Sequence, residues 1–448
     1  MASAYLTRTP SGGNYKIATF SAWVKRSNIS SGEQHLISFR SNDTYQFNIK
    51  FKSDDTIRLT DYAGATNMQI DTNRVFRDTN AWYHIVASFD STQSTASNRA
   101  KLWINGVQET SFSTATYPNL NGSMQINGNI SSNLVGAYSS SNYYFDGSMS
   151  HVHWIDGTQY QASDFGETDS TTGIWKPKTA PSVTYGTNGF FLKFENSASM
   201  GTDSSGNTNN FTVNGTMTKL IDTPNNVFAT LNSLATSTTL GSFSNGNTTH
   251  TKSDGVWAST TSTLAASSGK YYAEYKFTAN SSSSNGQMAA IVNMDLTNYM
   301  NENSDLEQSG NKGITYYPNG TVFADPQTTV ATYSSYGDAI IQIAMDLDNG
   351  FLYFGKDGTW QNSGDPTSGA TGTGGINISN YIGTGTYAFG LANRNTGSTS
   401  VNFGNGYFGT TAVTSAENPD DGIGIFEYDV PAGYRALCTK SINAEEYS

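Results

Sequence analysis

The sequence predicts an all-β protein built as two tandem antiparallel β-sandwiches. Charged residues make up only 13% of the chain and aromatic residues 12%, with 44 glycines, a balance typical of many short strands joined by polar turns. The sequence contains no heptad pattern and no long amphipathic helix. At 448 residues the chain is too long for one ordinary domain, and two sandwiches of roughly 200 residues each fit the usual range.

A double hairpin in the second half is the clearest local signal. Its two main strands are joined by Asn349-Gly350, and Asp357-Gly358 closes the second turn; both dipeptides supply the positive φ angles of tight turns. Before the first turn, apolar residues alternate with other residues, which predicts an antiparallel strand with one buried face. The alternating apolar residues are Ile341, Ile343, Met345 and Leu347, and those between them are Gln342, Ala344 and Asp346.

The segment around this hairpin resembles the SPRY family over roughly residues 233 to 410. The likeness rests on GKYYAEY from Gly269, on residues 345 to 360, on YAFG from Tyr387 and on VNFG from Val401, in the order that the family has them. It implies a bent two-sheet sandwich whose loops grip a partner and that has no chemistry of its own. The loops here are rich in Ser, Asn and Gly, so no ligand of that family carries over.

The first half contains a second set of strand-like runs. They are FSAWVKRS from Phe20, HLISF from His35, WYHIVASFD from Trp82 and KLWINGVQ from Lys101, the last with a two-residue Asn-Gly hairpin turn. Residues 1 to 219 resemble the laminin G-like branch of the concanavalin A-like lectin and glucanase superfamily, which implies a jelly-roll sandwich. The turn TDSSGNTNNF from Thr202 resembles a turn that lies near the first strand of many laminin G-like domains. Here it lies late in the chain, and the resemblance therefore implies a rearranged strand order.

We therefore expect a laminin G-like domain at residues 1–219, a connector at 220–234 and a SPRY-like domain with a C-terminal tail at 235–448. Short segments of this design resemble fibre or decoration proteins of tailed bacteriophages. The segments are Tyr5 to Pro10, Asp222 to Asn232 and Gly433 to Thr439. The resemblance implies a virion protein.

Charge and hydropathy exclude several classes of function. A formal net charge of -12 and no basic cluster argue against a nucleic-acid partner. No apolar run is long enough for membrane insertion, and the N-terminus lacks the apolar stretch of a secretory signal, so we expect synthesis in the host cytoplasm and a place in the virion. Cys438 is the single cysteine and is expected to be a small buried apolar residue.

The segment Tyr138 to Asp146, YSSSNYYFD, is the candidate glycan site. A pyranose has an apolar face and a rim of hydroxyls, so it needs an exposed aromatic ring beside hydrogen-bonding groups. We expect Tyr143 and Tyr144 to stack on a sugar and Asn142 and Asp146 to bond its hydroxyls. The alternative is that these tyrosines pack over a sheet edge. The segment from Asn298 to Asn303 is a second, vaguer candidate.

Two groups of residues suggest a metal ion. Asp203 and Asn207, beside Gly206, offer hard oxygens in a tight turn, and calcium prefers such ligands. The alternative is an Asx turn in which the backbone satisfies the aspartate. His151 and His153 share one strand face, but two histidines without a third ligand do not make a site.

No catalytic residue is predicted. A glycan hydrolase needs two carboxylates about five to ten ångström apart on one face, and the nearest cases are Glu427 with Asp429 and the isolated Glu274. We therefore expect a non-enzymatic virion surface protein of the tail-fibre type that recognises host surface glycans. The alternatives are a capsid decoration or head-fibre protein and a glycan hydrolase. Expected partners are other virion structural proteins and further copies of the chain, as a homo-oligomer or many symmetric copies.

Overall fold

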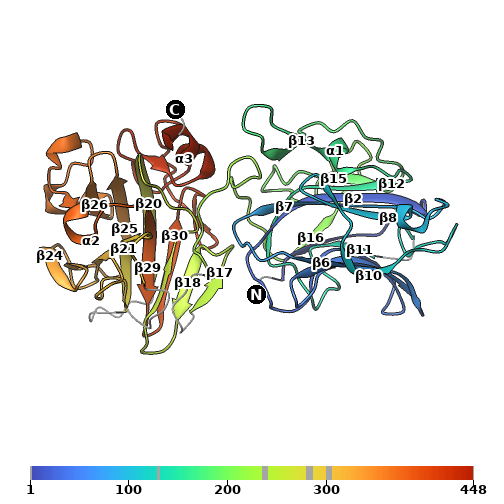
Figure 1. The fold of residues 1–448 in the computed structure, drawn as a ribbon, viewed down its shortest axis with the longest axis horizontal. Coiled ribbons are helices and arrows are strands. Elements are labelled where there is room, and N and C mark those ends of the chain that lie inside the picture. The colour runs from blue at the N-terminus through green and yellow to red at the C-terminus, as the bar shows by residue number, and fades with distance from the viewer. Residues whose placement is uncertain (1–2, 129–131, 235–240, 279–285, 299–304, 447–448) are drawn as a thin grey trace. The chain divides into compact units, whose positions relative to one another are not determined.

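A computed structural model describes residues 3–128, 132–234, 241–278, 286–298 and 305–446 (Figure 1). The chain divides into two compact units. The first is Met1–Lys219 with Thr223–Asn225, and the second is Leu220–Asp222 with Asn226–Ser448. Almost all regular structure in both is antiparallel strand, which confirms the predicted all-β fold class.

The first unit contains two large sheets (Figure 1). The eight-stranded sheet has the order β10 (Phe112–Thr116), β6 (Thr66–Val75), β5 (Thr56–Ala63), β4 (Tyr45–Phe51), β3 (Gln34–Arg40), β11 (Ser132–Val135), β1 (Tyr5–Arg8) and β16 (Thr212–Asn214). The six-stranded sheet has the order β15 (Phe190–Leu192), β12 (Gly147–Asp156), β2 (Ile17–Arg26), β7 (Trp82–Asp90), β8 (Ala100–Ile104) and β9 (Val107–Glu109). The short elements are η1 (Ala96–Asn98), α1 (Ala162–Phe165), β13 (Gly166–Thr168) and β14 (Trp175–Pro177).

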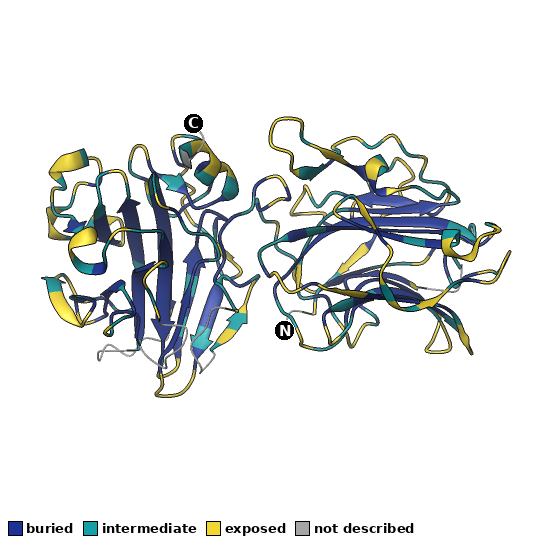
Figure 2. Cartoon of the chain, in the orientation of Figure 1, coloured by how far each residue is buried: buried dark blue, intermediate teal, exposed yellow. Residues whose placement is uncertain are grey.

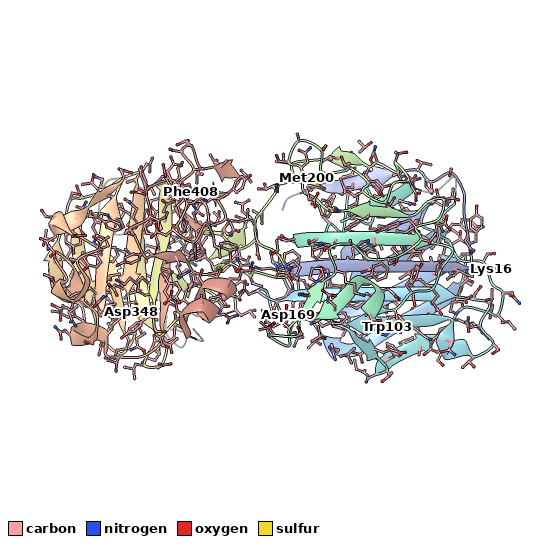
Figure 3. The ribbon with its side chains drawn as sticks, turned by 90° about the horizontal axis from the view of Figure 1, so that it is seen from above. Lys16, Trp103, Asp169, Met200, Asp348 and Phe408 are labelled. Atoms are coloured by element: carbon pink, nitrogen blue, oxygen red, sulfur yellow. The ribbon has the colours of Figure 1, made fainter. Side chains whose placement is uncertain are left out.

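Strand β7 shows how the sheets of the first unit are packed. Ile85, Ala87 and Phe89 point into the core between the sheets. Val86, on the other face, packs in a smaller cluster with Trp103 of β8, Ile155, Ala162 and Phe165. The segment that carries α1, β13 and β14 therefore covers the outer face of this sheet; Figure 3 labels Trp103 and, in the covering segment, Asp169.

The first and last strands of the first unit lie side by side. β16 pairs with β1 with Leu6 opposite Val213. The turn that begins at Thr202 lies between β15 and β16, so this late segment closes the eight-stranded sheet at its edge. The predicted two-residue turn between β8 and β9 is also present, with φ of 49° at Asn105 and 84° at Gly106.

The second unit also contains two large sheets. In the nine-stranded sheet the order is β17 (Ser242–Ser244), β18 (Thr249–Lys252), β30 (Gly397–Asn402), β20 (Lys270–Thr278), β25 (Ile340–Asp346), β26 (Phe351–Lys356) and β27 (Thr359–Trp360), with β28 (Ile376–Asn377) on β26 and β33 (Arg435–Ala436) on β20. The six-stranded sheet has the order β19 (Ala258–Thr261), β29 (Tyr387–Asn393), β21 (Gln287–Asn293), β22 (Gly313–Tyr316), β23 (Thr321–Ala324) and β24 (Thr328–Thr332). The short elements are β31 (Tyr407–Phe408), β32 (Thr411–Ala412), η3 (Gln361–Ser363), η4 (Gly369–Thr371), α2 (Ser379–Ile382) and α3 (Thr439–Glu446).

The predicted hairpin is β25 with β26, and its burial differs from the prediction. Ile341, Ile343 and Met345 lie in the core between the sheets, as expected. The opposite face of β25 is not exposed: Gln342 is 1% exposed and Asp346 is 0% exposed. The central strands of the second unit are dark blue in Figure 2, in agreement with the burial of residues on both faces of β25.

The C-terminal segment accounts for this second buried face. Ala344 packs in a cluster of Tyr272, Phe426, Tyr434 and Cys438, which the chain after residue 420 largely supplies. Cys438 is buried there, as predicted, and its thiol lies 3.2 Å from the hydroxyl of Ser441. Residues of the predicted connector belong to the same packing, since Phe228 lies in this cluster and Leu231 in the main core.

No helix in the described part of the chain is long and apolar enough to span a membrane.

Candidate functional site

The candidate glycan segment forms the loop between β11 and β12 in the first unit. Two backbone hydrogen bonds close it: Phe145 N–H donates to the Gly136 carbonyl at 2.9 Å, and His35 N–H donates to the Tyr143 carbonyl at 3.3 Å. The second bond exists because β11 pairs with β3, which carries His35 at its start. The loop is therefore fixed against a strand that lies about a hundred residues earlier in the chain.

Three rings from this loop and from β3 lie together. The ring centroid of Tyr143 is 5.9 Å from that of Tyr138 and 5.9 Å from that of His35, and Tyr138 is 5.0 Å from His35. His35 is 1% exposed, and burial lowers its pKa to about 4, so it is neutral at physiological pH. Tyr143 is 46% exposed and stands at φ 56°, a conformation unusual for a tyrosine.

Polar groups border these rings. The guanidinium of Arg40 lies 4.5 Å from the centre of the Tyr138 ring, within the range of a cation–π contact. Asp43 accepts hydrogen bonds from the Tyr138 hydroxyl at 2.7 Å and from Arg40, and these two bonds lower the pKa of its carboxyl. The exposed amide of Asn142 accepts from the Ser139 hydroxyl at 2.7 Å. We call this group the Tyr143 platform: Tyr143, Tyr138 and His35 with Asn142, Arg40 and Asp43.

The structure separates the other two predicted site residues from the platform. Tyr144 is half-buried against Tyr5, at 5.8 Å between ring centroids, and its hydroxyl donates to the Ser140 carbonyl at 2.7 Å. Asp146 accepts the Ser27 N–H through its backbone carbonyl at 3.0 Å, and burial raises the pKa of its carboxyl. Adjacent tyrosines thus point to different surroundings, so Tyr143 and Tyr144 do not form one stacking surface.

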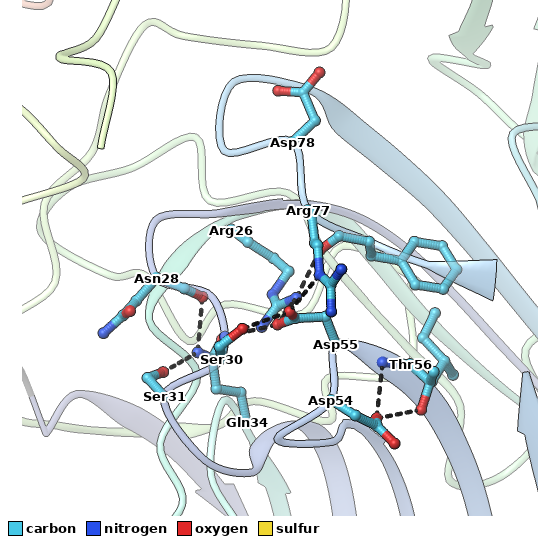
Figure 4. Close-up of polar contacts among 12 residues, drawn as sticks. Arg26, Asn28, Ser30, Ser31, Gln34, Asp54, Asp55, Thr56, Arg77 and Asp78 are labelled. Atoms are coloured by element: carbon cyan, nitrogen blue, oxygen red, sulfur yellow. Dashed lines mark hydrogen bonds and ion pairs between the residues drawn. The ribbon is translucent and has the colours of Figure 1, made fainter. Parts of the chain in front are cut away.

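A buried ion pair holds the loop between β2 and β3, which precedes His35 in the chain (Figure 4). The Arg26 guanidinium donates to the Asp55 carboxylate at 3.0 Å, and both side chains are 0% exposed. The same carboxylate accepts from the backbone N–H and the hydroxyl of Ser30, each at 2.7 Å, and from Arg77 at 2.9 Å. Because Ser30 lies in the loop between β2 and β3, this network fixes the chain that leads into His35.

The second glycan candidate, Asn298 to Asn303, lies outside the described residues apart from Asn298. The N–H of Asn298 donates to the Gly310 carbonyl at 3.1 Å.

The turn at Asp203 has the geometry of an Asx turn. One oxygen of its carboxylate accepts the N–H groups of Phe191 and Ser205, and the other accepts the N–H of Asn209 and the hydroxyl of Ser205, all at 2.8 Å. The amide of Asn207 donates to the carbonyls of Gly186 and Gly189 at 2.7 and 3.0 Å. These residues do not fit a calcium ion as they stand, because coordination would break bonds that already fill the carboxylate. Within the described part of the chain, no group of three His, Cys, Asp or Glu side chains is placed to hold a metal.

The two histidines of β12 pack on aromatic rings. The ring centroids of His153 and Phe191 are 3.9 Å apart, and His151 is 5.9 Å from the same ring. Burial lowers the pKa of both imidazoles. The hydroxyl of Tyr185 lies 3.0 Å from His153 Nδ1. His153 is buried and His151 is partly buried.

Glu274, one of the carboxylates considered for hydrolysis, lies in the interior of the second unit. Glu274 is 0% exposed, and its oxygens accept the N–H of Glu427 at 2.9 Å and the N–H of Tyr428 at 2.9 Å. Burial raises the pKa of Glu274 to about 7. These hydrogen bonds hold the C-terminal segment against β20.

Sequence patterns missed three members of the platform. His35, Arg40 and Asp43 belong to the segment HLISFRSND, which carries no sugar-binding pattern, and they reach the loop only through the pairing of β3 with β11. The one sign of these residues in the sequence was that Arg40 and Asp43 closely follow a predicted strand.

Comparison with known proteins gives a family for part of the chain. Residues 3–163 match the family model described as the Concanavalin A-like lectin/glucanases superfamily. The first unit therefore contains a concanavalin A-like domain, as the sequence predicts. No curated protein matches the chain at a significant level.

Solved structures resemble parts of the chain at low identity. The SPRY domain of human HERC1 is 10% identical, with a TM-score of 0.29, over 38% of this chain and 96% of that one. A native heptameric SAP-like pentraxin from Limulus polyphemus is 15% identical, with a TM-score of 0.29, over 48% and 89%. The TRIM65 PSpry domain is 9% identical, with a TM-score of 0.27, over 39% and 88%. At these sequence identities and TM-scores, the resemblances identify no function.

Proposed function

We propose that this protein is a non-enzymatic recognition protein that binds surface glycans through the Tyr143 platform. The observation that carries the proposal is the exposed ring of Tyr143, supported from below by Tyr138 and neutral His35. An exposed ring suits the apolar face of a pyranose, and Asn142, Arg40 and Asp43 lie where hydroxyl groups need partners. The match of residues 3–163 to a lectin-containing superfamily supports the same class of ligand.

The finer proposal places the protein on the surface of a tailed-bacteriophage particle, where it recognises host cell-surface glycans. The support is the combined likeness of three short segments, at Tyr5, Asp222 and Gly433, to fibre or decoration proteins of such phages. A single sugar contact has a dissociation constant near 1 mM, about 4 kcal/mol. Useful adhesion then needs many copies, because multivalency multiplies affinity by about 10² to 10⁴.

The test is binding of the purified full chain to a glycan array and to whole bacterial cells. Tyr143→Ala is expected to weaken binding about tenfold, the equivalent of roughly 1.4 kcal/mol, and Tyr143→Trp is expected to retain it because the aromatic face remains. Tyr15→Ala is the matched control: Tyr15 is 41% exposed and lies beyond the other end of β2, about 30 Å away for a ten-residue strand.

The outcomes separate the alternatives. Equal binding by wild type and Tyr143→Ala would remove the platform as the site. A capsid decoration protein would show no glycan signal and would copurify with heads at fixed stoichiometry. A hydrolase would release reducing sugar from host polysaccharide. Imaging a virion with this subunit labelled tests the location.

A further inference from the structure

The second unit contains a cavity of about 460 Å³ that no part of the glycan proposal uses. Four parts of the unit line it: β25 with Gln342, the turn between β26 and β27 together with Trp360, the loop that follows η3, and the C-terminal segment. The loop contributes Asp365 and Pro366, and the C-terminal segment contributes Tyr428, Asp429 and Pro431. Its volume lies within the range of pockets that hold small organic groups, about 300 to 1,000 Å³.

The walls of this cavity are aromatic and fixed in place. Trp360 packs edge-on against buried Tyr272, at 6.4 Å between ring centroids. Tyr428 lies over Gly358, where a Cβ atom would stand 3.0 Å from the Tyr428 ring, and Gly358 also has a positive φ of 83°. Glycine has no Cβ atom and tolerates a positive φ, so Gly358 allows this turn to lie close to the Tyr428 ring.

Buried polar groups hold the segments that carry the walls. The Glu274 carboxyl accepts the backbone N–H of Tyr428 at 2.9 Å and that of Glu427 at 2.9 Å. On the other side, the buried Tyr434 hydroxyl donates to the Pro366 carbonyl at 3.1 Å. The cavity is therefore pre-formed, because its walls are tied to the sheet and to one another without a ligand.

The charged residues that line the cavity, Asp365 and Asp429, are both acidic. No Lys, Arg or His is found among the described residues that line it. Asp365 is exposed at the rim, and one of its oxygens accepts from the N–H and hydroxyl of Thr367 at 2.9 and 2.6 Å. Asp429 is exposed, and among the described residues its carboxylate has no hydrogen bond or ion pair in the structure. Burial raises the pKa of Tyr428, and the nearby carboxyl groups of Asp357, Glu427 and Glu274 raise it further.

We propose that this cavity binds an organic cation, an alkylammonium or guanidinium group, between the rings of Trp360 and Tyr428 with Asp429 as its counter-ion. Aromatic faces attract cations within about 6 Å, and a carboxylate beside them adds a charge-assisted bond. A neutral sugar would gain from the rings but nothing from the negative potential. The same chemistry is carried by a lysine or arginine side chain of a partner protein and by a free amine.

Binding of three probes to the full chain tests the proposal by calorimetry and saturation-transfer NMR. Nα-acetyl-lysinamide is expected to bind with a millimolar dissociation constant, and more weakly at high salt because the attraction is screened. Nα,Nε-diacetyl-lysinamide, which lacks the charge, is expected to show no binding. Spermidine and a capped Gly-Gly-Lys-Gly-Gly peptide distinguish the sources: tighter binding of spermidine assigns a free amine, and tighter binding of the peptide assigns a protein side chain.

A matched pair of variants locates the site. Asp429→Asn is expected to raise the dissociation constant of Nα-acetyl-lysinamide about fivefold, in line with a partly exposed charge pair. Asp338→Asn removes the same charge from another exposed position of this unit and is expected to change nothing. Equal effects of the two variants, or equal binding of the neutral probe, would overturn the proposal. Tyr143→Ala must bind the probe as wild type does, so the glycan proposal can fail or succeed independently.

Discussion

The two units share a fold class but differ in which buried groups have shifted pKa values. The first unit contains four of the five histidines, and burial lowers the pKa of each; His35 titrates near pH 4 and His84 near pH 3. The second unit contains one, His250, with a pKa of about 4. It instead contains two buried glutamates, Glu274 and Glu307, whose pKa values burial raises to about 7.

The lowered pKa values of the histidines and the raised pKa values of the glutamates change the stability of the fold in opposite directions as the pH falls. A histidine with a folded pKa below 6.5 stabilises the fold above pH 6.5, and that contribution is lost as the pH falls, because the unfolded chain takes up the proton first. A glutamate with a folded pKa near 7 contributes fully below its unfolded value of 4.5, and that contribution is lost as the pH rises toward 7. Asp61 of the first unit, with a pKa raised to about 6, and Asp146, whose pKa burial also raises, oppose the four histidines of that unit.

Two buried carboxyl groups, Asp55 in the first unit and Glu274 in the second, are held in different ways. Burial alone would raise the pKa of Asp55, but hydrogen bonds from Ser30 and the charges of Arg77 and Arg26 hold it below the usual value. Glu274 has no such cation among its pKa determinants and is satisfied by backbone N–H groups and by the Tyr272 hydroxyl. Each carboxyl group thus fixes a distant segment of its unit, Asp55 with the help of cations and Glu274 with hydrogen-bond donors.

The largest expected effect is the loss of the ion pair in the first unit. Asp55→Ala leaves buried Arg26 without its partner, which typically costs about 3 to 5 kcal/mol. Pulse proteolysis read by mass spectrometry follows peptides of each unit separately, and only those of the first unit should become sensitive. The neighbouring Asp54→Ala, at a side chain 55% exposed, is the control and should cost at most about 1 kcal/mol. Equal sensitivity of both variants would contradict the role of the pair.

The second effect is the divergence of the units in acid. Between pH 7 and pH 5, His35 and His84 should each cost the first unit about 2 kcal/mol, whereas Glu274 should stabilise the second by about 2 kcal/mol. The same proteolysis experiment at the two pH values is therefore expected to show the first unit weakened and the second unchanged or strengthened. Parallel changes in both units would show that the comparison is wrong.

The fold class followed from the sequence because strand alternation and tight Asn-Gly turns are local features. Ile341, Ile343 and Met345 were predicted to be buried and are. Burial of Gln342 and Asp346 was not predictable, since it depends on the C-terminal segment folding back over β25. Alternation of apolar and polar residues indicates which face of a strand contacts the core. It does not indicate whether a distant segment of the chain covers the other face.

The candidate site shows the same limit. The loop from Tyr138 could be singled out from its aromatic and amide content, but not the partition of adjacent Tyr143 and Tyr144 between an exposed platform and a half-buried cluster. His35 and Arg40 join the platform only through strand pairing. Local chemistry was therefore predictable, and long-range assembly of the site was not.

A third, smaller effect isolates one carboxyl group. Glu274→Gln removes the titrating proton and is expected to abolish the gain of about 2 kcal/mol that the second unit makes on moving from pH 7 to pH 5. The first unit should keep its acid response, because its histidines are unaffected. The measurement is the difference between the two pH values for each unit, so a uniform loss of stability in the variant does not obscure the result. A gain that survives in Glu274→Gln would assign it to Glu307 instead.

The smallest expected effect concerns calcium in the first unit. Because four donors already fill the Asp203 carboxylate, adding a chelator should leave the thermal midpoint of both units unchanged. A genuine site would behave differently: calcium at a hundred times its dissociation constant would stabilise its own unit by about 2.7 kcal/mol and leave the other unaffected. A chelator-induced fall confined to the first unit, reversed by calcium and not by magnesium, would therefore show that the Asx turn opens to coordinate the ion.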